Sequence, residues 1–157
     1  YQEMGNRQAE ADMWATLGHA AFLRGDTALA LGYFGSSFRF YLHVVNQLND
    51  QSLEQVGQVP YHLNSAFIGT ALIAIGAGNH ERATILLGQV SLLHEGNEQF
   101  PEPVLHKLHE QGIAALRAHL GDDKFDRLWA AGRGMPFKDA LEIALGDTGA
   151  AAAEPAP

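Results

Sequence analysis

The sequence contains no cysteine, which excludes a disulfide framework, a thiol nucleophile and any thiolate metal site. Basic residues are also few: ten Lys and Arg stand against eighteen Asp and Glu, and the formal net charge is −8 with histidines neutral. An acidic chain repels a phosphate backbone, so we expect no nucleic-acid contact by this segment. The longest apolar run, over 66–77, is shorter than the roughly 20 residues of a membrane span. The chain does not open with a basic segment followed by an apolar core, so we expect no signal peptide. We therefore expect a cytoplasmic protein with no membrane partner.

Apolar residues recur at helical spacing nearly throughout, and no run alternates between polar and apolar residues. Gly5-Asn6 resembles a helix stop followed by a start, and the chain opens without Met, so we expect a fragment of a longer protein. The pattern predicts a first helix to Gly25, a second from Asp26 to about residue 48, and a short helical turn at 52–56. Pro60 predicts a break before a helix over 61–75. Further helices are expected from Gly78-Asn79 to Leu93 and from 101–103 to Leu120, with a stop at 121–123. A short helix that holds Phe125, Leu128 and Trp129 is expected to stop at Gly132, and a last helix to begin at Phe137.

Two stretches share one pattern, in which an apolar helix is followed by a Gly-Asp or Gly-Asn turn and a second helix that opens with alanine. The first stretch contains Trp14, Leu17, Gly18, Ala30 and Phe34, and the second contains Phe67, Thr70, Ala71, Ala83 and Leu87. This sequence pattern matches that of tetratricopeptide repeats, in which small residues let the two helices of a pair approach each other closely. The two turns lie 53 positions apart, more than the ~34 of a regular array, so the repeat is degenerate. We predict an all-α fold of about 6–7 helices, with antiparallel hairpins stacked as a short right-handed superhelix.

The second half of the chain resembles a known family more closely. The resemblance lies in residues 78–88 (GNHERATILLG), 120–125 (LGDDKF), 128–135 (LWAAGRGM) and 140–145 (ALEIAL). In that order they resemble the C-terminal tetratricopeptide-like helical-repeat region of bacterial LuxR-type and predicted-ATPase transcriptional regulators. Pro136 departs from the family pattern, which usually has a capping Ser before the final helix. The resemblance implies signal integration through protein contacts and, in some members, through a small inducer.

Residues 1–146 are thus expected to form one helical-repeat domain, and 147–157 an Ala- and Pro-rich flexible tail. We expect a non-catalytic interaction and sensing region of a multidomain transcriptional regulator or signalling ATPase. The alternative is a stand-alone adaptor that binds a peptide or partner protein in its concave groove. No phosphate-binding G-x-x-x-x-G-K-[ST] loop occurs in the chain, so an ATPase module would lie outside it.

The histidines raise a metal hypothesis, with His106, His109 and Glu110 as the tightest group. Zinc sites need three or four supported ligands, and this spacing is not H-E-x-x-H, so we expect solvated surface histidines and no metal or other cofactor. His19 shares a helix face with aromatic residues and has no Ser or carboxylate partner at readable spacing. We interpret it as a packing residue and expect no catalysis. Gly132-Arg133-Gly134 is interpreted as the turn between the last two helices.

In a tetratricopeptide stack the first helix of each hairpin lines the concave face. That register gives an apolar surface that a preceding repeat, a partner, a ligand or a second copy of the chain must cover. A homodimer of the fragment is one form this could take. Phe34, Phe38 and Tyr41 keep helical spacing and are expected in the core, whereas Phe40 points off that stripe. The candidate groove or partner contacts are Asp12, His19, Phe22, Phe40, Ile68, Leu72 and Ile75.

Overall fold

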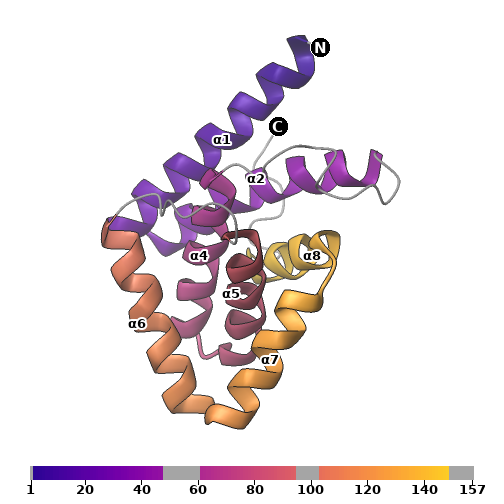
Figure 1. Ribbon diagram of the computed structural model, residues 1–157. Helices are drawn as coiled ribbons and strands as arrows, with labels where there is room; N and C mark the ends of the chain where they lie inside the picture. The colour runs from indigo at the N-terminus through magenta and orange to yellow at the C-terminus, as the bar shows by residue number, and fades with distance from the viewer. Residues whose placement is uncertain (1, 48–60, 95–102, 149–157) are drawn as a thin grey trace.

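The computed structural model describes residues 2–47, 61–94 and 103–148, and these form seven α-helices with no strand among them (Figure 1). The all-helical prediction is therefore confirmed, while the superhelical arrangement of the hairpins stays a prediction. No helix in these three ranges is both long and apolar enough to cross a membrane. The helices are α1 (Gln2–Leu23), α2 (Thr27–Gln47), α4 (Tyr61–Gly76), α5 (His80–His94), α6 (Pro103–Leu120), α7 (Asp122–Gly134) and α8 (Phe137–Thr148).

The turns of the first two hairpins, α1–α2 and α4–α5, have the same backbone geometry. Gly25 has φ 85° and Gly78 has φ 90°, a left-handed conformation that only glycine adopts at little cost. In each turn the residue after the glycine donates its backbone N–H to the carbonyl five residues earlier, at 2.9 Å for Asp26 and 2.8 Å for Asn79. The Asp26 carboxylate then accepts the N–H of Leu29 at 3.3 Å, which confirms it as the cap of α2. The two turns that the sequence pattern predicted therefore have the same backbone structure.

Phe34 of α2 joins the two hairpins at the centre of the core. A Cβ built on Gly18 of α1 would lie 2.6 Å from its ring, and one built on Gly69 of α4 would lie 2.7 Å from the same ring. The ring is fully buried, so glycine on both sides provides the space that it fills. Phe38 continues the contact, with its ring 5.1 Å from that of Phe67 on α4. Gly18 of the repeat pattern therefore allows close helix approach, as predicted, and Gly69 allows a second close contact between the two hairpins.

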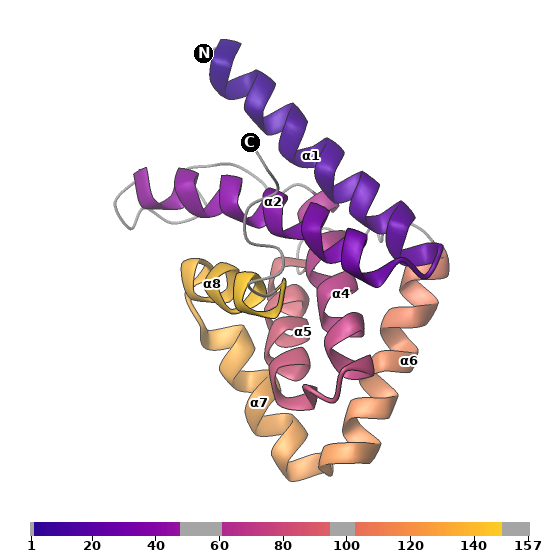
Figure 2. The same ribbon diagram turned by 180° about the vertical axis from the view of Figure 1, so that it is seen from behind.

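The third pair of helices, α6 and α7, is open rather than closely paired. Only Gly121, with φ 85°, separates the two helices. Figures 1 and 2 show α6 and α7 on opposite sides of the α4–α5 hairpin, meeting in a corner beyond the α4–α5 turn. Because α7 packs chiefly on α5 and α6 packs on α4, the second hairpin lies between the two arms of the third.

The α5–α7 contact is a close crossing of two backbones. A Cβ at Gly88 would collide with the carbonyl oxygen of Trp129, and a Cβ at Gly132 would collide with that of Ile85. The buried Gln89 amide beside this crossing donates to the Gly132 carbonyl at 2.6 Å and to the Met135 carbonyl at 3.1 Å. The Gly132 carbonyl also accepts the backbone N–H of Met135 at 3.4 Å, so Gln89 adds a second donor from another helix at the end of α7.

The last helix, α8, returns to the first hairpin and packs mainly against α2. The backbone N–H groups of Asp139 and Ala140 donate to the Pro136 carbonyl at 3.0 and 3.2 Å, so the first turn of α8 forms with proline just before it. The Phe137 ring lies 6.1 Å from that of Phe67, edge to face, and ties α8 to α4. The fold therefore closes from the C-terminal helix back onto α2.

Two of the helix boundaries predicted from the sequence differ in the structure. Gly5-Asn6 is not a helix boundary, because α1 runs through it from Gln2; the cost of one glycine, about 1 kcal/mol, does not stop a helix of good helix formers. Gly132-Arg133-Gly134 is the last turn of α7 and not a loop, since the Gly132 backbone packs on α5. The proposed turn over 52–56 and the Pro60 break lie outside the described residues, as does the expected tail from 149 onward, while Asp147 and Thr148 belong to α8.

Candidate functional site

The predicted groove residues on α1 lie at its contact with the rest of the fold. Asp12 is half-buried and accepts a hydrogen bond from the Tyr41 hydroxyl of α2 at 2.9 Å. Burial, followed by the hydrogen bond and the negative charge of Asp12, raises the pKa of the Tyr41 phenol far above its usual value. Asp12 is therefore engaged in holding α1 to α2, and Tyr41 remains a neutral donor at every ordinary pH.

His19, Phe22 and Phe40 are all half-buried, with only part of each side chain open to solvent. Phe22 and Phe40 pack against the core, and the Phe40 ring lies 5.1 Å from the Tyr41 ring in an edge-to-face arrangement. Phe40 is thus less exposed than the sequence suggested. Asp12, His19 and Phe22 follow one side of α1, so the structure brings these three together.

The predicted groove residues on α4 are covered by the chain itself. Ile68 is 1% exposed and belongs to the core. A Cβ on Gly112 of α6 would lie 2.8 Å from Leu72 Cδ2 and 3.3 Å from Ile75 Cδ1, so the two residues pack under α6. The expectation that this part of α4 needs an external cover is therefore corrected, because α6 covers it.

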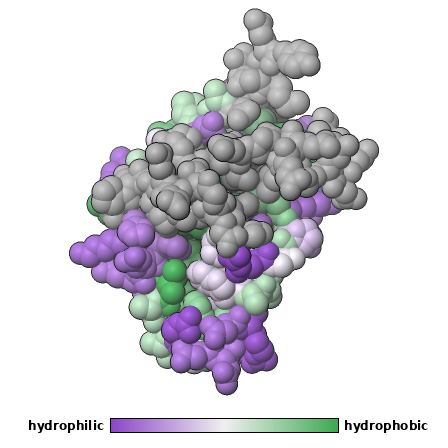
Figure 3. Space-filling view, viewed as in Figure 1, coloured by the Kyte–Doolittle hydropathy of each residue, from purple (hydrophilic) through white to green (hydrophobic). Residues whose placement is uncertain are grey.

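A second cluster, missed from the sequence, lies where the start of α5 meets the end of α6 and the start of α7. We call it the polar corner, and Figure 3 shows polar side chains at this end of the molecule. The imidazole rings of His80 and His119 are stacked there with centroids 3.7 Å apart and planes 15° from parallel. Lys124 of α7 pairs with Glu81 of α5 at 2.6 Å. Arg117 makes the third connection, between α6 and α7.

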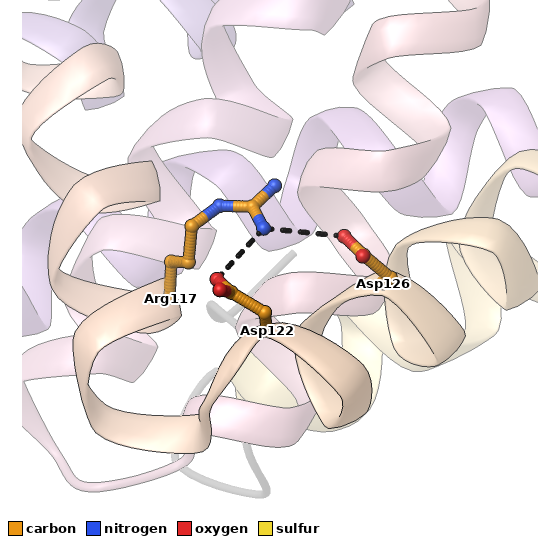
Figure 4. A network of polar contacts seen from close by, with 3 residues as sticks. All are labelled: Arg117, Asp122 and Asp126. Carbon is orange, nitrogen blue, oxygen red and sulfur yellow. Dashed lines mark hydrogen bonds and ion pairs between the residues drawn. The ribbon is translucent and has the colours of Figure 1, made fainter.

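Arg117 joins α6 to α7 across the Gly121 turn, as Figure 4 shows. Its guanidinium lies 3.0 Å from the Asp122 carboxylate, 3.3 Å from that of Asp126, and 4.3 Å over the Phe125 ring. The Asp122 hydrogen bond is the main cause of a raised pKa for Arg117, and the Lys124 hydrogen bond is the main cause of a lowered pKa for Glu81. These exposed pairs orient three helix ends more than they stabilise the fold.

The metal hypothesis for the α6 histidines receives no geometric support in the described part of the chain. His106 Nε2 lies 3.0 Å from Glu110 Oε1, whereas His109 is buried, so the two imidazoles lie in different surroundings. Within residues 2–47, 61–94 and 103–148, no group of three or more His, Asp or Glu side chains is placed to hold a metal ion. The expectation of solvated histidines is wrong for His109.

The sequence contained one usable signal for the contacts that it missed. Gly88 stands inside a strong helical pattern, where an unexplained glycine indicates close backbone approach, whereas Gly132 resembled a helix stop. The stacking of His80 on His119 had no such signal, because it joins residues of different helices with no pattern between them.

Comparison with known proteins gives a limited similarity. Over 67 residues the chain is 30% identical to proteins described as "Putative HTH-type transcriptional regulator" from Mycobacterium bovis and from two strains of Mycobacterium tuberculosis. The match covers 43% of this chain but only 8% of each relative. No family model matches the chain. No solved structure matches it either.

Proposed function

We propose that this chain is a non-catalytic interaction and sensing region of a larger transcriptional regulator. The observation that supports the proposal is the 30% identity to proteins described as HTH-type transcriptional regulators. The matching segment makes up only 8% of the length of each regulator. A region of that relative size fits one module among several. The helical hairpins described above supply a stiff, side-chain-rich surface of the kind that binds proteins or peptides.

In this proposal a partner or inducer acts by binding one arrangement of the regulator better than another. The half-buried side of α1 and α2, with Asp12, His19, Phe22 and Phe40, is the surface that we assign to this contact. Its rigidity would come from the Asp12–Tyr41 hydrogen bond and from the Phe34 packing beneath. We propose in addition that the regulator is of the LuxR type and acts in the cytoplasm.

The first test is to read the gene on both sides of the codons for this chain. We expect one open frame that also encodes a helix-turn-helix DNA-binding domain. A frame that encodes this domain alone would overturn the regulator proposal and favour the adaptor.

The second test uses the full regulator with Phe22→Ala and Phe40→Ala together. We expect DNA binding in a mobility-shift assay to be unchanged and the transcriptional response to the inducing condition to be lost. The matched control is Val104→Ala, an exposed apolar residue of α6 that is not among the assigned contacts, which should leave the response intact. An unchanged response in the double variant, with the domain shown to be folded by circular dichroism, would contradict the assignment of this surface.

A further inference from the structure

The outer side of α1 carries an apolar stripe that nothing in the described fold covers. Figures 1 and 2 show α1 along the edge of the molecule, and its contacts are mainly with α2 and α4 on its inner side. Met13 is 53% exposed, and the hydroxyl of Thr16 donates to the Asp12 carbonyl at 2.9 Å, within its own helix. The outer stripe consists of Ala9, Met13, Thr16, Ala20 and Leu23, all exposed.

The members of the outer stripe are spaced at alternating intervals of four and three residues. This is the spacing by which one helix presents a continuous seam to another helix. Three small residues, Ala9, Thr16 and Ala20, stand among Met13 and Leu23 along the seam, so large side chains of a facing helix would find room beside the small ones. The stripe therefore has the geometry of a helix-pairing surface and not of scattered exposed residues.

A row of three residues flanks the stripe on one side. Glu10, Leu17 and Arg24 are all exposed and stand seven positions apart. The row is complementary to a second copy of itself that runs in the opposite direction. Glu10 of each copy then faces Arg24 of the other, and the two Leu17 side chains face each other. In a parallel pairing this row would face the other flank of the second helix, so Glu10 would not meet Arg24; only an antiparallel pairing brings the row against its own copy.

We infer that the outer stripe binds the outer stripe of a second copy of this chain, with the two α1 helices antiparallel. A two-fold axis near Leu17 places Glu10 opposite Arg24 of the second copy, and Met13 beside Leu23 and Ala20 of the second copy. The interface is isologous, because both copies contribute the same surface. A single helix pair buries less than the about 1,200 Å² of a stable complex, so the dimer forms in a concentration-dependent equilibrium.

The test is analytical ultracentrifugation of the purified chain over a wide concentration range. We expect a monomer–dimer equilibrium, and Met13→Glu should raise the dissociation constant at least about tenfold, since it places a charge in the apolar seam. The matched control is Val104→Glu on α6, where an equally exposed apolar residue lies outside the stripe; its dissociation constant should stay that of the parent. A chain that remains monomeric at every concentration overturns the inference. This result is expected if another segment or another protein covers the stripe.

Charge exchange tests the antiparallel pairing itself. Glu10→Arg and Arg24→Glu should each weaken the dimer, whereas the double variant should recover the parent dissociation constant because both cross-helix pairs are restored with reversed sign. Absence of recovery in a folded double variant contradicts the antiparallel arrangement. None of these residues lies in the partner surface proposed for α1 and α2, so failure of either idea leaves the other testable.

Discussion

Single residues control this fold most visibly where a side chain is missing. Gly132 is a helical position at which the backbone of α7 touches the backbone of α5 at Ile85. Gly134, two positions later on the same helix, has open space where its Cβ would be. The two glycines therefore have different reasons for being there, although the sequence pattern treats them alike.

Gly132→Ala should destabilise the protein by about 1–3 kcal/mol or more, because the colliding neighbour is backbone and cannot rotate away. Gly134→Ala is the control, and we expect no loss or a gain of up to about 1 kcal/mol from reduced unfolded-state entropy. Urea unfolding followed by circular dichroism measures both. Equal stability of the two variants would show that the α5–α7 crossing relaxes at no cost.

The Tyr41–Asp12 hydrogen bond is the second residue-scale feature. Tyr41→Phe leaves the half-buried Asp12 carboxylate without this donor and should cost about 1–3 kcal/mol in urea unfolding. Asp12→Asn with Tyr41→Phe should cost less than the sum of the single changes, because the two residues share the interaction. Additive losses would contradict coupling through this bond.

The pKa of Tyr41 also sets a pH limit. Its folded value is raised above the unfolded value of 10.0, so the stabilisation is complete below about pH 10 and is lost as the pH rises through the folded pKa. In a titration followed by the ultraviolet absorbance of tyrosinate, Tyr41 should ionise only when the protein unfolds at high pH. The Tyr41→Phe variant should lack this last ionisation step. A phenol that titrates near 10 in the folded chain, absent from Tyr41→Phe, would show that the site is open to solvent.

At the scale of elements, the polar corner shows how three helix ends are oriented without a buried core between them. Glu81 stands in the first turn of α5, and Lys124 in the first turn of α7, so their pair links two helix starts. Arg117 does the same for α6 and α7. Since these groups are exposed, salt should weaken them more than it weakens the packed crossing of α5 and α7.

The Glu81–Lys124 pair predicts a measurable pKa. The folded pKa of Glu81 lies below its ordinary 4.5, so the contribution of the pair to stability is present above that pH and is lost as the pH falls through the folded pKa. Carboxyl-carbon NMR titration should show the lowered value, and Lys124→Met should move the pKa of Glu81 back towards 4.5. A titration of Glu81 that does not respond to Lys124→Met would contradict the pairing in solution.

On the scale of the whole molecule, Phe34 couples the first hairpin to the second. Its ring stands between Gly18 and Gly69, so it cannot move away from a group added on either side. The return of α8 to α2 then joins the last helix to the same first hairpin. The described helices are thereby expected to unfold together and not repeat by repeat.

Gly69→Ala should therefore destabilise the chain by about 1–3 kcal/mol through overpacking against Phe34. Combining it with Phe34→Leu should make the added loss from Gly69→Ala smaller than in the parent, because leucine leaves room for the methyl group. Thermal unfolding of the four proteins measures this coupling. Equal losses in both backgrounds would show that the ring does not bridge the hairpins.

The local structure could be predicted from the sequence to within a few residues. Gly25, Gly78 and Gly121 end or separate helices because each adopts positive φ, and Asp26 caps α2 because its carboxylate reaches a free N–H. Such signals act between residues close in the chain, so a sequence carries them openly. The repeat pattern and the burial of Ala30, Phe34, Ala83 and Leu87 follow from the same periodicity.

The tertiary structure alone decided which of these helices meet. The placement of α6 over Leu72 and Ile75 removed part of the predicted groove, and the α5–α7 crossing turned Gly132 from an apparent stop into a contact. The stacking of His80 on His119 joins helix ends whose sequences share no pattern. Contacts of this kind depend on how surfaces distant in the chain fit together, and that fit is a property of the packed molecule, not of any one segment.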